Sequence, residues 1–349
     1  MKYNVEKPEV ISNGSLESVE ITLGDPNVIF DLLRKQYTYP IQTPVQEGLC
    51  NARDSHRKAK QKKRFEVKLP TATYPFFSIR DFGTSMSGDD FVNIWAGMGN
   101  STKRDSNEFT GGFGIGSKAW FAYRNNWFYK IHFDGKVKTY EITTAKIYSG
   151  SAELREIADS SEMQGIEVIV PIKPEDAVKF EQAFYRATYF WKEDEKPIVV
   201  NRKKEELSEI WLSNEDTLSL NDEITLYPIK TITAFSRNFD KIKDFMLVVD
   251  GIPYVVNTSL LNYNIKYDSY NDNKIKEGAK PYQASCDILR TAYLNSEAKV
   301  PVFHVKIGEI KLVNHRENID FSEENVKKVI NLIQQSKIKL DKLILTECS

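Results

Sequence analysis

The sequence predicts an α+β protein in which an α/β sandwich domain is followed by a second α/β domain. Helical and strand patterns alternate along both halves of the chain, which is typical of mixed folds. At 349 residues the chain exceeds the ~250–300 residues at which a single hydrophobic core stops growing. Lys, Glu, Asn and Ser accumulate at residues 195–222. We therefore expect a junction within 172–200, with a first domain at 1–195 and a second at 196–349.

The first domain begins with a strand-like alternation at residues 18–23, and Asp25-Pro26 has the N-cap and early-proline pattern of a helix start. Further helices are predicted at 43–59, 89–97 and 174–194. Strands are predicted at 64–69 and 76–80, and three or four more between 127 and 171. The last of these strands, 165–171, is a nearly continuous apolar run suited to a buried strand.

In the second domain, strands are predicted near 197–200, 224–234, 245–256 and 300–313. A terminal helix is predicted at 322–344, because Ser322 offers an N-cap with acidic residues in the first turn. One apolar face follows at helical spacing, made by Val326, Val329, Ile330 and Ile333.

The composition argues against several classes of function. The net charge of −1, from 48 basic and 49 acidic residues, gives no strong nucleic-acid signal. The one basic cluster, at 57–64, is interpreted as a solvated loop or helix end. Three scattered cysteines and four histidines without paired spacing fit neither a disulfide framework nor a zinc site.

The chain has no apolar run of the ~18 residues needed for a transmembrane segment and no apolar signal core. We expect a cytoplasmic protein, which would be in the host cytoplasm if the gene is carried by a phage. Peripheral attachment at the inner membrane stays open.

Three polar side chains share one face of the helix at 43–59. Glu47, Asn51 and Asp54 are separated by four and then three residues, which places them on one stripe. A carboxylate one turn before a carboxamide suits a nucleotide site. Asn51 could hold a magnesium ion by its oxygen, and Glu47 could polarise a water for attack on a γ-phosphate. An exposed polar helix face would give the same pattern.

A carboxylate follows directly on the strand at 76–80. Asp81 could accept a hydrogen bond from an exocyclic amino group such as that of adenine. Gly83 permits a tight turn and lets the backbone approach the base, and Met86 can pack against the face of the base. By itself this is also the pattern of an ordinary strand-to-turn Asp-x-Gly.

A glycine-rich segment precedes an apolar helical stretch that begins at Ala119. Glycines before a helix let backbone amides converge on phosphate oxygens, and the helix N-terminus adds positive potential. The segment is not a Walker A loop. Lys118 adds a point charge or is simply solvated. The candidate phosphate-binding residues are Gly112, Phe113, Gly114, Ile115, Gly116, Ser117 and Lys118.

The order of these three motifs resembles the ATP-binding (Bergerat) fold of gyrase B, the heat-shock chaperones, histidine kinases and MutL, the GHKL superfamily. Residues 87–110, rich in Gly, Ser, Asn and charge, fall where those proteins have a mobile ATP lid. Within the superfamily, the amino-acid sequence is similar to that of the phage rapid-lysis rIIA proteins. The similarity is carried by residues 11–15, 54–56, 80–83, 101–118 and 165–171.

The resemblance implies roles for individual residues. Glu47 would be the general base and Asn51 the Mg²⁺ ligand, with Asp54 beside the ATP. Asp81 would read adenine, with Gly83 and Met86 lining the base pocket. The second domain would be transducer-like, of the ribosomal S5 domain 2-like type, and would supply a basic residue to the γ-phosphate. The candidates are Lys306, Lys311, His315 and Arg316.

Three residues depart from the family pattern. Relatives often have arginine before the catalytic glutamate, where this chain has Gln46. The second glycine of the Asp-x-Gly-x-Gly loop is Ser85, and the threonine that often follows the glycine of the last strand is Ile166. These changes bear on turnover and nucleotide affinity more than on the fold.

The leading hypothesis is a slow Mg²⁺-dependent ATPase of the rIIA type, whose nucleotide state controls lid closure and homodimerisation. It would act in lysis control or against host defence, with a second phage or host protein as a partner. The alternative is a nucleotide-gated interaction module or scaffold without turnover. A topoisomerase or repair subunit lacks support because no cleavage domain is evident, and no phosphoacceptor-histidine helix indicates a histidine kinase.

Overall fold

The computed structural model describes residues 37–96, 116–143, 151–203, 217–228, 231–232, 244–257, 299–313, 317–320, 322, 324–332, 335 and 338. The chain divides into two compact units, Met1–Phe180 and Glu181–Ser349. This division falls within the interval 172–200 that the sequence marks as a junction. Each unit combines helices with a β-sheet, so the predicted α+β class is confirmed.

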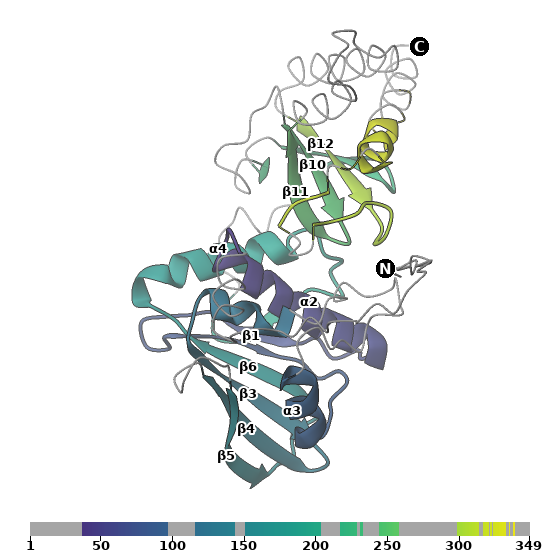
Figure 1. Ribbon diagram of the computed structural model, residues 1–349. Helices are drawn as coiled ribbons and strands as arrows, with labels where there is room; N and C mark the ends of the chain where they lie inside the picture. Colours follow the sequence, from purple (N-terminus) through teal and green to yellow (C-terminus); the bar gives the residue numbers. More distant parts are fainter. Residues whose placement is uncertain are drawn as a thin grey trace, which may run out of the picture. The chain divides into compact units, whose positions relative to one another are not determined.

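The sheet of the first unit is antiparallel, and its strands lie in the order β5-β4-β3-β6-β2-β1 (Figure 1). The strands are β1 (Glu66–Lys68), β2 (Phe76–Arg80), β3 (Asn126–Phe133), β4 (Lys136–Thr143), β5 (Ser151–Asp159) and β6 (Gly165–Pro171). Central β6 is paired on both sides, with β2 and β3. Gly165, Val168 and Val170 of β6 are buried and the residues between them are half-buried, so this apolar strand is covered mainly on one face.

One face of this sheet is covered by helices. They include α2 (Gln42–Ala59), α3 (Gly88–Ala96) and the 3₁₀ helix η1 (Gly116–Ala122). After β6 the chain continues into η2 (Pro174–Asp176) and α4 (Ala177–Thr188). Buried residues in register across four strands form the floor of this core: Val67, Ile79, Val168 and Tyr129. Trp120 of η1 is 1% exposed.

The opposite face of the sheet carries charge. Glu66, Arg80, Glu167 and Lys130 lie in register on neighbouring strands and alternate in sign. Cross-strand pairs of opposite charge contribute about 0.2–1 kcal/mol each. The alternation of apolar and charged residues along these strands therefore separates the two faces, with the helix-covered core on one side.

Two glycines bring α2 close to its neighbours. A Cβ at Gly48 would lie 2.9 Å from Ile79 Cδ1 and 3.0 Å from Trp120 Cζ2. A Cβ at Gly83 would lie 2.5 Å and 2.6 Å from the backbone carbon and oxygen of Ser55. The turn after β2 therefore packs directly on the main chain of α2, and only a residue without a side chain fits there.

The second unit is built on a five-stranded mixed sheet in the order β11-β10-β12-β9-β8. Its strands are β8 (Leu218–Asn221), β9 (Ile224–Pro228), β10 (Asp244–Val249), β11 (Ile252–Asn257) and β12 (Lys299–Val305), and the short β7 (Ile198–Val199) also falls in this unit. Its core includes Tyr189, Ile232, Met246, Val248 and Val302.

Several predicted boundaries in this region are wrong. The strand expected at 224–234 ends at Pro228 and residues 231–232 are helical, whereas β8 was missed within the polar stretch. The strand expected at 245–256 is a hairpin, because Asp250 and Gly251 both have positive φ, 48° and 80°, and form the turn. The helix expected at 174–194 ends at Thr188, whose hydroxyl donates to the Phe184 carbonyl.

The other expected elements of the described ranges are confirmed. They include α2, α3, β1, β2 and four strands between 126 and 171. The strand expected at 300–313 ends at Val305 and continues only as isolated bridges. The terminal helix is present at 324–332. The elements expected at 18–23 and from 25, and residues 97–110 of the lid, lie outside the described residues.

Gly83→Ala should destabilise the protein by about 1–3 kcal/mol or more, because the added methyl group meets backbone that cannot rotate away. Gly48→Ala is the matched control: its methyl group meets side-chain atoms, and alanine adds about 1 kcal/mol of helix propensity. Urea unfolding of both variants measures the difference. Equal or larger destabilisation by Gly48→Ala would contradict the close approach at Gly83.

Candidate functional site

The polar face of α2 is intact in the structure. Glu47 and Asp54 are buried, with 8% and 1% of their surfaces exposed, and Asn51 is half-buried between them. All three lie within one uninterrupted helix, as their spacing predicts. Burial of two carboxylates on a single stripe excludes the alternative of a simple solvated helix face.

The end of β2 is joined to α2 through Asp81. The Ser55 hydroxyl donates to Asp81 Oδ1 at 3.1 Å, and the backbone N–H of Gly83 donates to the same oxygen at 2.9 Å. Asp81 is 7% exposed. Burial raises the pKa of its carboxyl from 3.8 to about 6, although the bonds from Gly83 and Ser55 act to lower it.

His56, the residue after Ser55, forms a second link to the same turn. Its Nε2 accepts a hydrogen bond from the backbone N–H of Phe82 at 2.8 Å. Burial lowers the pKa of His56 from 6.5 to about 4, so the imidazole is neutral and can accept this bond at pH 7. Two neighbouring side chains of α2 therefore hold two neighbouring residues of the turn.

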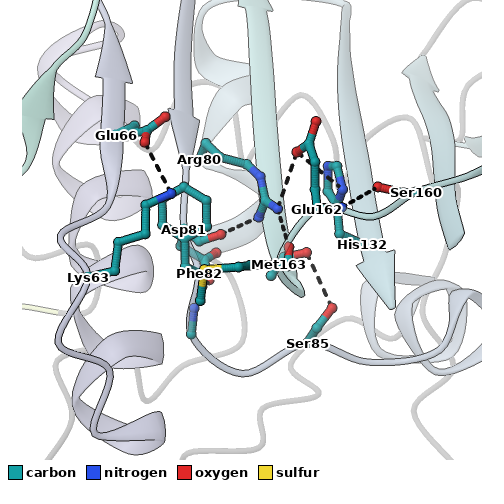
Figure 2. Close-up of polar contacts among 12 residues, drawn as sticks. Lys63, Glu66, Arg80, Asp81, Phe82, Ser85, His132, Ser160, Glu162 and Met163 are labelled. Carbon is teal, nitrogen blue, oxygen red and sulfur yellow. Dashed lines mark hydrogen bonds and ion pairs between the residues drawn. The ribbon is translucent and has the colours of Figure 1, made fainter. Parts of the chain in front are cut away.

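Arg80 fixes the backbone behind Asp81 from the other side of the sheet. Its guanidinium donates to the carbonyl oxygens of Asp81 and Met163, and Glu162 Oε2 lies 3.7 Å from Nη2 (Figure 2). His132 Nδ1 is 3.6 Å from the same Glu162 oxygen. The segment that leads into β6 is thereby tied to the end of β2.

The start of β6 completes the surroundings of Asp81. The backbone N–H of Asp81 donates to the Ile166 carbonyl at 2.9 Å. Gly165 has φ +140°, and a Cβ there would collide with the Asp81 carbonyl. Ser85 donates to the Gly165 carbonyl at 3.3 Å (Figure 2). Ser85 thus links the turn to β6 by its side chain.

The remaining candidate residues of the first unit are described in part. Met86 is half-buried in the turn before α3. Gly112, Phe113, Gly114 and Ile115 lie outside the described residues, and Gly116 and Ser117 are described only as the first residues of η1. Lys118 is 4% exposed, and burial lowers the pKa of its ammonium group. The alternative of a solvated Lys118 is therefore wrong.

In the second unit, two of the four basic candidates are described. Lys311 Nζ lies 2.7 Å from Glu324 Oε2 and forms an ion pair with it. Lys306 is exposed, just after β12. His315 and Arg316 lie outside the described residues.

Ser55 and His56 are the site residues that the motif analysis missed. Ser55 lies four residues after Asn51 and eight after Glu47, so the same helical spacing that selected those two also selects Ser55. His56 shows no such signal, because its role depends on a contact with a turn 26 residues away.

The described residues hold no cluster of three or more His, Cys, Asp or Glu that could bind a metal ion. Within the same ranges, no helix combines the length and the apolar character needed to cross a membrane.

Comparison with known proteins gives a structural likeness only. No family model matches the sequence, and no curated protein matches it. Among solved structures, the chain is similar to the ATPase region of Saccharomyces cerevisiae topoisomerase II, with 11% identity and a TM-score of 0.49, over 85% of each chain. The same region bound to ICRF-187 (dexrazoxane) matches with the same identity and TM-score, over 85% of this chain and 86% of that one.

Two buried groups where α2 meets the turn, Asp81 and His56, should give opposite pH dependences of stability. The raised pKa of Asp81 contributes stability that is present below pH 3.8 and is lost as pH rises through about 6. The lowered pKa of His56 contributes stability that is present above pH 6.5 and is lost as pH falls through about 4. In the wild type the two largely cancel.

Asp81→Asn removes one side of this balance. When the pH is lowered from 7.5 to 4, the free energy of unfolding of Asp81→Asn should fall relative to that of the wild type, by up to about 3 kcal/mol. This is the free energy that corresponds to the raised pKa of Asp81 in the wild type. Urea unfolding of both proteins across this range measures the difference. A difference between the two that stays constant with pH would contradict the assignment.

Proposed function

We propose that the chain binds ATP with Mg²⁺ and hydrolyses it slowly. The observation that carries the proposal is that two parts of the candidate site contact the same helix, α2, at different positions along it. Asp81 contacts the helix at Ser55, whereas η1, which follows the glycine-rich segment, packs against it at Gly48, next to Glu47. A nucleotide along this helix would have its base at Ser55 and its phosphates at Glu47.

The base end suits an amino group. The Ser55 hydroxyl and the Gly83 N–H both donate to Oδ1 of Asp81, and Oδ2 would accept from the exocyclic amino group of adenine. Met86 follows in the same turn and offers an apolar surface for the ring. A carboxylate fixed by two donors keeps its orientation when the base arrives, which reduces the entropic cost of binding.

The phosphate end suits hydrolysis. At 1.5 Å per residue, Asn51 lies ~6 Å and Glu47 ~12 Å along the helix from Ser55. Mg²⁺ prefers oxygen ligands and usually keeps substrate phosphates and waters among them, so the Asn51 amide oxygen would hold it together with the nucleotide. When bound, the ion neutralises charge on the phosphates.

Glu47 would then act as general base. It would accept a proton from a water whose oxygen forms a bond to the γ-phosphorus, while the bond from phosphorus to the bridging oxygen breaks and ADP departs. The buried Lys118 and the backbone amides of 111–117 would stabilise the charge on the γ-phosphate.

The biological role follows from the rIIA resemblance rather than from the fold. We propose lysis control or action against host defence, in the host cytoplasm, with a nucleotide-dependent homodimer and a second phage or host protein as partner. One observation favours the alternative of a module without turnover. Gln46 is buried beside Glu47, 7% exposed, where relatives often have a cationic arginine.

Isothermal titration of a non-hydrolysable ATP analogue with Mg²⁺ should give binding by the wild type. Asp81→Asn should bind about 10–100-fold more weakly, because the amide loses a charge-assisted hydrogen bond worth ~1.5–3 kcal/mol. Equal affinity of the two proteins would rule out Asp81 as the base reader, and no binding by the wild type would contradict the proposal itself.

Glu47→Ala should still bind the analogue but lose ATP hydrolysis by at least about 100-fold, the usual contribution of a general base. A steady-state phosphate-release assay measures the rate, with Glu66→Gln as the matched control, since Glu66 lies on the charged face of the sheet. Hydrolysis by Glu47→Ala at the wild-type rate would exclude Glu47 as the base. Binding without turnover by the wild type would favour the interaction module.

A further inference from the structure

We propose that Ser55 is the positioning residue that sets base specificity, by holding Asp81 as an acceptor for the amino group of adenine. This inference rests on the proposed function and deepens it. It predicts discrimination against 6-oxo purines such as hypoxanthine, which present an acceptor where adenine presents a donor.

The Ser55 hydroxyl lies within hydrogen-bond distance of three oxygen atoms of Asp81 and Thr84. Its Oγ lies 3.1 Å from Asp81 Oδ1, 3.2 Å from the Thr84 carbonyl and 3.3 Å from Thr84 Oγ1. A hydroxyl has one proton to donate. If Thr84 Oγ1 donates to Ser55, the Ser55 proton is left for Asp81, and an ionised carboxylate is a stronger acceptor than a carbonyl.

Ile166 explains why this hydroxyl comes from α2. The proteins that the sequence resembles often have a threonine at this position, whereas isoleucine has no hydroxyl. Ile166 contributes its carbonyl instead, which accepts the Asp81 N–H. Among the described residues, the Ser55 hydroxyl and the Gly83 N–H donate to Oδ1 of the carboxylate, and a backbone hydrogen bond from Ile166 also lowers the pKa of Asp81. Neither Ser55 nor Gly83 donates to Oδ2, and we assign this oxygen to the base.

The charge state of Asp81 decides which base it can read. An ionised carboxylate only accepts, whereas a protonated one can donate to a 6-oxo group. Donation from Ser55 favours the ionised form, against the burial that raises the pKa of Asp81 to about 6. Among the described ionisable groups, Arg80 at the end of β2 acts on the charge of Asp81, His56 of α2 bonds the next residue, Phe82, and Glu162 faces Arg80.

The effect of Ser55 on base specificity can be measured by comparing how each variant binds an adenine nucleotide and a hypoxanthine nucleotide. Non-hydrolysable analogues of ATP and of inosine triphosphate, each with Mg²⁺, are titrated into wild type, Ser55→Ala and Ser78→Ala at pH 7. Ser78 is a matched control, a serine of β2 that is 2% exposed and bonded to Tyr74 rather than to Asp81.

Wild type and Ser78→Ala should prefer the adenine analogue by about tenfold or more, the worth of one hydrogen bond to a charged group. In Ser55→Ala this preference should fall to about threefold or less, mainly by weaker binding of the adenine analogue. Equal weakening of both ligands in Ser55→Ala, or an unchanged preference, would overturn the proposal.

A second measurement needs no nucleotide. The pKa of Asp81, followed by carboxyl-carbon NMR in the free protein, should rise in Ser55→Ala and stay at the wild-type value in Ser78→Ala. An unchanged Asp81 pKa in Ser55→Ala would overturn the role of Ser55 alone. Wild type that binds neither analogue would overturn the proposed function, and the base specificity with it, even if the pKa rises.

Discussion

The contact between the C-terminal half of α2 and the turn after β2 positions Asp81 in the candidate site. Ser55 and His56 hold Asp81 and Phe82 by side-chain hydrogen bonds, and the missing side chain of Gly83 lets the turn lie on the helix backbone. The two hydrogen bonds join residues 26 positions apart in the sequence. Without them, Asp81 would not be oriented relative to Asn51 and Glu47, which lie on the same helix.

This arrangement buries the carboxylate of Asp81 away from water. A buried carboxylate is costly unless donors surround it, and here two donors meet one oxygen of Asp81 while Arg80 binds the carbonyl of the same residue. The remaining cost is visible in the raised pKa of Asp81. A group kept near its titration point by its surroundings is typical of a binding or catalytic site.

Two departures from the pattern of the proteins that the sequence resembles lie at this contact. Ile166 and Ser85 differ from the usual residues, yet both remain bonded to their neighbours, Ile166 through its carbonyl and Ser85 through its hydroxyl. A hydroxyl beside Asp81 is supplied from α2 by Ser55 instead of from β6. Gln46, the third departure, is buried beside Glu47, and under the proposed function its lack of charge would bear on turnover.

The sequence alone determined the α+β class, the helix at 43–59 with its polar stripe, and the strand that ends before Asp81, because these depend on local periodicity and on the residues at element ends. It did not determine the hairpin at 250–251 or the end of α4, where turn geometry and packing overrode the local pattern. The roles of Ser55 and His56 and the burial of Lys118 were decided only by the tertiary structure. The reason is physical: burial and hydrogen bonding depend on which distant segment packs against a residue, and no local pattern encodes that partner.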